Sequence, residues 1–181
     1  MIKIHLDTDI GGDIDDLCAL AFVLSHPDVQ LVGVTTVADE NGRRAGYARY
    51  ALGLAGASSV PVAAGADVSL GRFRFRPGYP PHERYWPEPV PAAPGPRDAA
   101  RDLLQSAIRE HAVVVGIGPF TNLALHEAGA TLHQREAPRG RETRVVTRVD
   151  GAAFGDRWCA TLVEAAGRRA AGERGPGQRA P

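Results

Sequence analysis

The sequence predicts an α/β protein whose mostly parallel, open sheet is covered by helices on both faces. Short runs rich in β-branched residues alternate with longer helical segments along most of the 181 residues. This alternation is typical of βαβ units. The run VQLVGVTTVA at 29–38 is almost continuously apolar or β-branched, as expected of a strand covered on both sides. Crossovers between such strands are right-handed.

The predicted elements follow one another in a regular order. A strand over 2–7 leads to a helix over 15–27 that is apolar nearly all round, and the strand over 29–38 leads to a helical segment over 41–57. A short strand over 60–65 comes next. The pattern resumes with a helix over 98–111, a strand over 112–118 and a helix that begins at 119. A last strand and a last helix are expected within 141–166.

Two stretches depart from this pattern. Residues 67–97 are rich in proline, arginine and aromatic residues and have no helical or strand period, so they are predicted to form a long loop. Within it, the alternation RFRFR at 72–76 favours an edge strand over an anion site. Residues 167–181 have the composition of a disordered tail. One α/β domain is therefore expected over 1–166.

Composition excludes several functional classes. Lysine plus arginine and aspartate plus glutamate balance at 21 each, which indicates neither a nucleic-acid nor a membrane partner. The start MIKIHLD lacks the apolar segment of a signal peptide, and no run approaches membrane-spanning length. The two cysteines lie far apart in the sequence and imply no disulfide framework. A cytoplasmic protein that acts on a small molecule is the expectation.

The densest chemical signal is a set of five aspartates at the end of the first predicted strand, with no lysine or arginine among them. They are Asp7, Asp9, Asp13, Asp15 and Asp16. Ligands of open α/β sheets bind at this edge, and the Gly11–Gly12 pair permits the turn that returns the chain to it. A helix N-terminus offsets about one such charge, by at most about 2 kcal/mol. The remaining repulsion predicts a bound hard cation, and the all-oxygen ligands favour Ca²⁺.

Other interpretations of the acids explain less. A single D-x-D is more often a helix cap than a metal site, but five acids reverse that preference. An EF-hand loop needs a glutamate at its twelfth position, where this chain has Cys18, and a helix before it, where a strand is predicted. A haloacid-dehalogenase-like phosphatase also has D-x-D after its first strand, but this leaves Asp15 and Asp16 unexplained.

Three motifs in the same order carry a resemblance to a known family. DTDIGGDIDDLCAL, VQLVGVTTVADE and VVVGIGPFTNLAL resemble the corresponding segments of the inosine–uridine-preferring nucleoside hydrolases. The resemblance covers about residues 2–126. It implies a Rossmann-like core and an enzyme that hydrolyses the N-glycosidic bond of a ribonucleoside to ribose and free base with the help of one Ca²⁺ ion.

The resemblance also implies roles for individual residues. Asp7 matches a structural residue on the metal side of the site. Asp9 matches the acid that contacts both Ca²⁺ and the attacking water and acts as general base. Asp15 matches the residue that holds a ribose hydroxyl, and Asp16 matches a Ca²⁺ ligand. Thr121 matches the residue whose backbone carbonyl ligates the metal.

The chain departs from the family in its later part. The family's long middle and late section, which supplies ribose contacts and a late His-Asp pair, has no clear match, so the chain resembles a truncated member with a deletion near 127–133. Two hypotheses follow. The protein is an active nucleosidase, or it is an inactive relative that binds metal or nucleoside without turnover. Loss of covering elements also predicts an exposed apolar face and a possible homo-oligomer.

A few residues keep two interpretations. Asp39 and Glu40 stand near the position of a family metal-pocket residue, but exposed loop acids are favoured. Tyr85 and Trp86 are suited either to stacking on a nucleobase or to fixing the long loop to the core. His82 is expected to be a solvent-exposed loop residue rather than a contact to the base.

Overall fold

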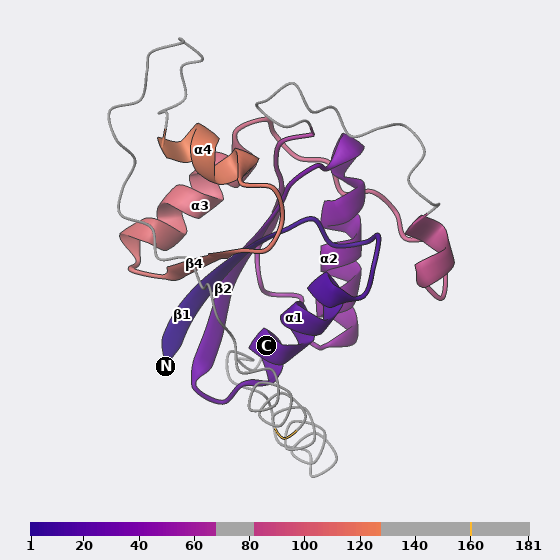
Figure 1. The fold of residues 1–181 in the computed structure, drawn as a ribbon, viewed down its shortest axis with the longest axis horizontal. Helices are drawn as coiled ribbons and strands as arrows, with labels where there is room; N and C mark the ends of the chain where they lie inside the picture. The colour runs from indigo at the N-terminus through magenta and orange to yellow at the C-terminus, as the bar shows by residue number, and fades with distance from the viewer. Residues whose placement is uncertain (68–81, 128–159, 161–181) are drawn as a thin grey trace.

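A four-stranded parallel sheet forms the centre of the protein, as the sequence predicts. The structure, a computed structural model, describes residues 1–67, 82–127 and 160. The strands are β1 (Ile2–Thr8), β2 (Val29–Thr36), β3 (Val62–Ala64) and β4 (Val113–Gly116), and they lie in the order β3-β2-β1-β4 (Figure 1). The strand and helix predicted within 141–166, the edge strand at 72–76 and the predicted tail lie outside the described residues.

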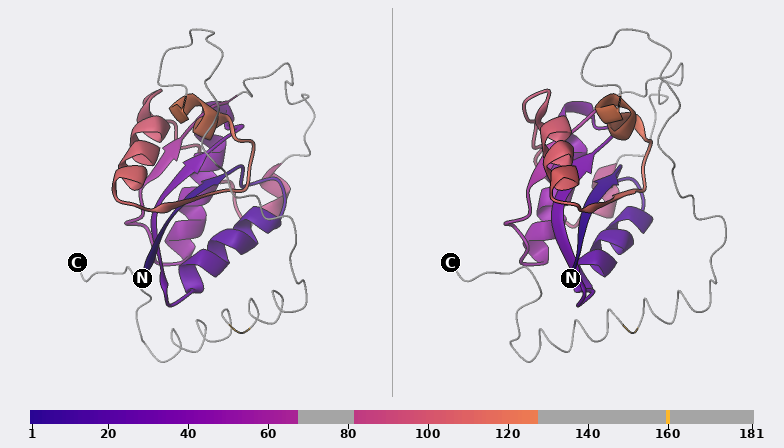
Figure 2. Two further views of the ribbon diagram at one scale, coloured as in Figure 1. Left: turned by 60° about the vertical axis from the view of Figure 1, so that its left-hand side comes forward. Right: turned by 90° about the vertical axis from the view of Figure 1, so that its left-hand side faces the viewer.

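Helices cover both faces of the sheet. On one face lie α1 (Asp15–Ser25) and α2 (Arg43–Leu54), and on the other lies α3 (Ala99–Arg109), while α4 (Thr121–Glu127) follows β4 (Figure 2). Two 3₁₀ helices, η1 (Glu40–Gly42) and η2 (His82–Tyr85), complete the described elements. The second corrects the expectation that 67–97 contains no regular element, because one short helical turn forms there. No helix in the described ranges is long and apolar enough to cross a bilayer.

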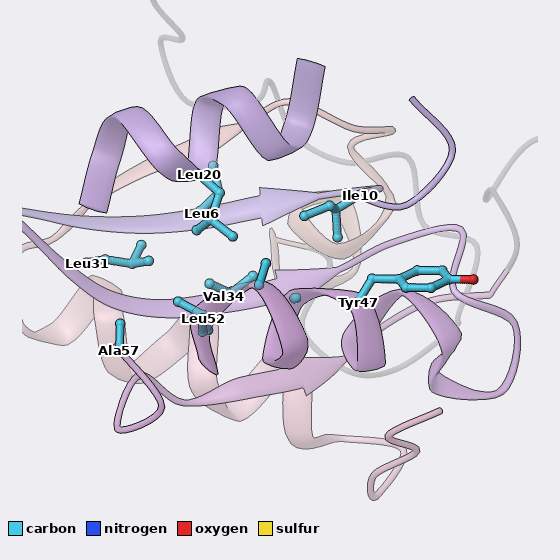
Figure 3. Packing of buried hydrophobic residues seen from close by; sticks show 10 residues of the cluster. Leu6, Ile10, Leu20, Leu31, Val34, Tyr47, Leu52 and Ala57 are labelled. Carbon is cyan, nitrogen blue, oxygen red and sulfur yellow. The ribbon is translucent and has the colours of Figure 1, made fainter. Parts of the chain in front are cut away.

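The apolar core lies between the sheet and the α1–α2 layer. Leu6 and Val34 of the two central strands meet Leu20 of α1 and Leu52 of α2, and each is at most 1% exposed (Figure 3). Burial of such side chains stabilises a fold by about 1.5–3 kcal/mol each. Leu20 is the fully buried apolar residue of α1, whose other apolar residues are only partly covered. The layer therefore positions the start of α1 at the carboxyl edge of the sheet.

An irregularity between β1 and β2 arranges polar residues on the opposite face. The register shifts between Ile4 and His5, so that His5 pairs with Gly33 and Asp7 pairs with Thr35. A side chain at Gly33 would place its Cβ 3.0 Å from His5 Nδ1. The glycine therefore makes room for the imidazole, and the bulge places the side chains of His5, Asp7 and Thr35 in one buried row.

The strand order creates a switch point beside β1. The chain passes from β1 to β2 and β3 on one side and then crosses back to place β4 on the other side of β1. Crevices at such switch points bind ligands in open α/β sheets. The β4 region also exposes apolar side chains, with Val113 52% and Phe120 63% exposed, in agreement with the predicted apolar surface.

Candidate active site

The acid loop, residues 9–14, joins β1 to α1 at the switch point. Gly11 adopts a φ of 128°, which a side chain would disfavour. The fully buried Ile10 anchors the loop, and its N–H donates to Thr8 Oγ1 at 3.2 Å. The five aspartates differ in their surroundings. Asp7 and Asp16 are buried, Asp9 is partly exposed, and Asp13 and Asp15 are exposed.

Asp7 is a fully buried carboxylate whose two oxygens differ. Its Oδ1 accepts hydrogen bonds from Thr35 Oγ1 at 2.5 Å and from Asn122 Nδ2 at 2.8 Å. Its Oδ2 is buried and has no hydrogen-bond partner among the residues that the structure describes. Burial raises the pKa of Asp7, the charge of Asp9 adds to this, and the two hydrogen bonds oppose it. An unpaired buried carboxylate oxygen is costly, so this atom is a candidate contact for a ligand.

His5 extends this row of polar groups beneath the site. His5 Nε2 lies 3.0 Å from Thr35 Oγ1, whose hydroxyl hydrogen is directed to Asp7. The hydroxyl must therefore accept from His5, which places the proton on Nε2 of a neutral ring. Burial lowers the pKa of His5 to about 4, in agreement with the neutral form. Sequence reasoning gave His5 no role, because a histidine within an apolar strand carries no signal of its own.

Asp16 lies at the start of α1 and is 5% exposed. Thr8 Oγ1 donates to its Oδ1 at 2.5 Å. Burial raises the pKa of Asp16 to about 6, and the charges of three neighbouring aspartates, Asp9, Asp15 and Asp13, add to this, while the Thr8 hydrogen bond opposes it. Asp16 is thus a carboxylate that a nearby cation would strongly favour in its charged form.

The acids act as one electrostatic cluster. Asp13, Asp15 and Asp16 each offer a carboxylate oxygen within 4.8 Å of the others. A hydrogen bond shared with Asp15 raises the pKa of Asp13, and burial and the charges of Asp15 and Asp9 add to this. Of the predicted metal ligands Asp7, Asp9, Asp16 and Thr121, this group contains only Asp16. Asp9 joins the cluster through its charge, which acts on Asp7, Asp13 and Asp16.

The beginning of α4 connects the ends of three strands. Asn122 Nδ2 donates to Asp7 Oδ1 and to the Thr36 carbonyl, both at 2.8 Å, and its Oδ1 accepts from the Ala66 N–H at 2.9 Å. Thr121 beside it is buried. The sequence predicts a metal-binding role for Thr121 but none for Asn122, although both belong to the GPFTN motif. The Asn122 side-chain amide thus connects the ends of β1 and β2 and the segment after β3, next to the acid loop.

A close backbone approach places the end of β4 against Asp9. A Cβ at Gly118 would lie 2.8 Å from Asp9 Oδ1 and 2.9 Å from Val37 Cγ1. These separations are below van der Waals contact, so only glycine fits without displacing a neighbour. Gly118 thereby brings the turn that carries Thr121 up to the carboxylate of Asp9.

Asp39 is a buried helix-capping residue, which corrects the expectation of an exposed loop acid. It is 2% exposed, and it accepts hydrogen bonds from Thr36 Oγ1 at 2.6 Å and from the N–H groups of Arg44 at 2.7 Å and Ala45 at 3.0 Å. It therefore satisfies the first turn of α2. Glu40 is exposed, as expected.

The aromatic pair of the long loop divides between two environments. Trp86 stacks on Tyr47 with ring centroids 4.6 Å apart and planes 6° apart, so it fixes the loop to the core. Tyr85 is 49% exposed and lies under the Arg84 guanidinium. The side chain of His82 lies outside the described residues, so its expected exposure stays a prediction.

Fold and site together define an open parallel α/β protein with a cluster of acidic residues at the switch point between β1 and β4. Residues 4–131 match the model of the inosine-uridine preferring nucleoside hydrolases, and the chain belongs to that family. The resemblance carried by the three sequence motifs is thereby confirmed.

Individual relatives agree with this membership. A Corynebacterium ammoniagenes protein described as an uncharacterized protein in the ribF 3′ region is 44% identical over 69 residues, which are 37% of this chain and 73% of that protein. The plant nucleoside hydrolase PpNRh1 superposes with a TM-score of 0.59 at 28% identity, over 70% of this chain and 42% of its own. A purine-preferring ribonucleoside hydrolase from Gardnerella vaginalis shares the fold, with a TM-score of 0.55 at 22% identity over 71% and 44% of the two chains. The chain spans less than half the length of these two hydrolases.

Proposed function

We propose that this chain carries the cation- and ribose-binding edge of a nucleoside hydrolase, and that its reaction is hydrolysis of the N-glycosidic bond of a ribonucleoside. The observation that supports this most directly is the buried Oδ2 of Asp7, which has no hydrogen-bond partner in the described part of the chain and belongs to a run of five aspartates in the sequence. Membership of the nucleoside hydrolase family supports the substrate class.

The residues present fit a hard divalent cation. Carboxylate oxygens of Asp13, Asp15 and Asp16 lie within 4.8 Å of one another, and the charge of Asp9 acts on Asp13 and Asp16. Oxygen-only donor sets of this kind suit Ca²⁺ better than metals that prefer sulfur or imidazole. We propose that Asp16 and Asp9 hold the ion together with Asp7 and the Thr121 carbonyl. An ion held by these residues would supply Lewis-acid chemistry, which would orient the ribose hydroxyls and lower the pKa of a water.

The exposure of the acids supports a division of roles. Asp9 is partly exposed, so it can accept the proton of an attacking water as general base. Asp15 is exposed at the first turn of α1 and can accept a hydrogen bond from a ribose hydroxyl. The carboxylates together stabilise the positive charge that develops on the sugar ring in an oxocarbenium-like transition state.

Binding without turnover is the second candidate function. It is favoured by the coverage of only 42% and 44% of two solved hydrolases. Loss of one oriented group typically lowers a rate by a factor of about 10² to 10³, and several family contacts have no match in this sequence. We therefore expect the 181-residue chain by itself to release ribose slowly or not at all.

A ribose-release assay over a panel of ribonucleosides tests both candidates. It compares the wild-type chain in Ca²⁺ and in EDTA with Asp9→Ala, and with Glu40→Ala as a control at an exposed acid. Release that requires Ca²⁺ and disappears only in Asp9→Ala supports the hydrolase. Calorimetric binding of Ca²⁺ and inosine without release supports the second candidate. Absence of both release and binding would show that the proposal is wrong.

A further inference from the structure

Two side chains from outside the acid loop hold its backbone at consecutive carbonyl groups. Arg44 of α2 donates from Nη1 to the Ile10 carbonyl at 3.1 Å, and Trp86 donates from Nε1 to the Gly11 carbonyl at 3.4 Å. The two donors approach from different parts of the chain. The loop is therefore held by partners that are not themselves acids.

Arg44 connects the loops that follow the two central strands. It is 7% exposed, and its Nε donates to the Ala38 carbonyl at 2.8 Å while Nη1 reaches Ile10. Its backbone N–H is fixed by Asp39. The guanidinium charge also acts on Asp13, where it opposes the repulsion among the acids. A planar fork with several donors suits this double contact, and a lysine ammonium does not reproduce it.

Trp86 connects the acid loop to a second segment, residues 84–94, called the strap here. Its ring stacks on Tyr47 and lies edge-on to Tyr50, with centroids 5.8 Å apart. Farther along the strap, the Ala93 N–H donates to the Gly42 carbonyl at 2.8 Å. A Cβ at Gly46 would lie 2.2 Å from the Pro91 carbonyl oxygen, so the missing side chain lets the strap lie directly on α2. The indole is thus held rigidly where it meets Gly11.

The acid loop needs such support before any cation arrives. Its aspartates repel one another, and Gly11 gives the backbone more freedom than another residue would. A site whose competent form is only partly populated binds with an affinity reduced by that fraction. We infer that Arg44 and Trp86 are positioning residues that preform the acid loop for its cation, and that Trp86 couples the strap to the site. This inference rests on the proposed function.

Calorimetric titration with Ca²⁺ alone tests the inference. Trp86→Phe keeps an aromatic ring beside Tyr47 and removes the N–H donor together with the second ring of the indole, so its dissociation constant should rise roughly threefold to tenfold. Arg44→Lys loses the double contact, and its dissociation constant for Ca²⁺ should rise about tenfold or more. Neither variant alters a proposed ligand, and the melting temperature of Trp86→Phe in EDTA measures how much the smaller ring costs the fold apart from any effect on Ca²⁺ binding.

Matched controls come from the same two segments. Tyr85→Phe changes an aromatic residue of the strap beside Trp86. Arg49→Lys changes an arginine of α2 that donates to the Val62 carbonyl at 3.2 Å, away from the acids. Both should bind Ca²⁺ within about twofold of wild type, since the hydrogen bonds of these two residues in the described part of the chain go to Val62 and Arg84 and not to the acid loop.

The outcomes separate this inference from the proposed function. If wild type binds Ca²⁺ and Trp86→Phe and Arg44→Lys bind it equally well, the positioning roles are wrong and the cation site stands. If wild type binds no Ca²⁺, the cation site and the inference both fail. Should Arg44→Lys not fold, hydrogen exchange of the acid-loop amides in EDTA decides with Trp86→Phe alone. Faster exchange there supports the inference, and unchanged exchange overturns it.

Discussion

Two loops at the same edge of the sheet use the same residue type in opposite ways. The loop after β2 contains Asp39, and the loop after β1 is the acid loop; each lies between a parallel strand and a helix. Asp39 accepts three hydrogen bonds, two of them from the first turn of α2. Within the described ranges, Asp16 accepts from one side chain, Thr8, and Asp7 accepts both of its hydrogen bonds on one oxygen.

The difference shows that donors, more than position, decide what a carboxylate does. The N–H groups of helix α2 compensate the charge of Asp39, so this residue has a structural role. The acids around β1 have fewer donors than their charge requires, and burial and mutual repulsion raise the pKa of Asp7, Asp13 and Asp16. Such surplus charge is what a bound cation would stabilise.

Removal of Asp39 should have the largest effect on stability. Asp39→Ala loses three buried hydrogen bonds and leaves two helix N–H groups without their partner, so unfolding in EDTA should require about 4 kcal/mol less free energy. Urea denaturation measures this loss. The neighbouring Glu40→Ala is the control and should change stability by no more than about 0.5 kcal/mol. Full restoration of Asp39→Ala by Ca²⁺ would contradict the purely structural role.

His5 should make the β1 side sensitive to acid. Its folded-state pKa of about 4 lies below the ordinary value of 6.5. The unfolded chain therefore binds the proton more readily. The contribution of His5 is complete above about pH 6.5 and is lost as pH falls towards 4, by about 3 kcal/mol in total. Stability measured against pH should lose this part of its slope in His5→Gln and keep it in His111→Asn, at an exposed histidine. An equal slope in both variants would exclude His5 as the cause.

In the metal-free protein, Asp16 should make stability fall as pH rises, which is the opposite of the pH dependence expected for His5. Its folded-state pKa is raised from 3.8 to about 6, so its favourable contribution is present below about pH 4 and is lost as pH rises through 6. At about pH 8 in EDTA, Asp16→Asn should therefore be more stable than wild type, by about 2 kcal/mol, because the amide can still accept from Thr8. A lower stability of Asp16→Asn under these conditions would show that the charge is already compensated.

Calcium should make wild type more stable than Asp16→Asn. Binding to the native state alone stabilises wild type by about 2.7 kcal/mol at a hundredfold excess over Kd. Asp16→Asn should lose most of this rise in melting temperature. Equal shifts in wild type and variant would place the ion elsewhere.

The pattern of the sequence was sufficient for the fold and for the location of the acids. Alternating strands and helices predicted a parallel sheet, and the density of aspartates predicted the edge at which they gather. It did not predict that Asp39 is buried and caps α2, because two of the three donors to Asp39 are backbone groups. They are brought to it by left-handed conformations at Asn41 and Gly42, with φ of 56° and 76°.

Contacts distant in sequence were the other part that could not be predicted. The role of His5 depends on a register shift and on Thr35, 30 residues away. The link from Trp86 to Gly11 joins residues 75 positions apart. The sequence left Trp86 between two interpretations because an aromatic residue in a loop suits both a ligand and the core. Such choices are made by tertiary packing, which no local pattern records.

The smallest effect on stability, and the most local one, should come from Gly118. In Gly118→Ala the new methyl group would meet Asp9 Oδ1 at 2.8 Å and Val37 Cγ1 at 2.9 Å. Val37 is 1% exposed and packed, and the Asp9 backbone nitrogen would lie 3.0 Å from the new methyl group, so the turn at Gly118 and the Asp9 carboxylate must shift relative to each other. We expect a stability loss of about 1 kcal/mol, but a several-fold weaker affinity for Ca²⁺ in calorimetry.

Gly53→Ala is the matched control, because its nearest neighbour, Ser58 Oγ, lies 3.8 Å from the added Cβ, and alanine favours a helix interior by up to about 1 kcal/mol. That variant should be slightly stabilised and bind Ca²⁺ normally. Unchanged affinity in Gly118→Ala would mean that Asp9 does not hold the ion, and the surplus charge near β1 would then have to be compensated without it.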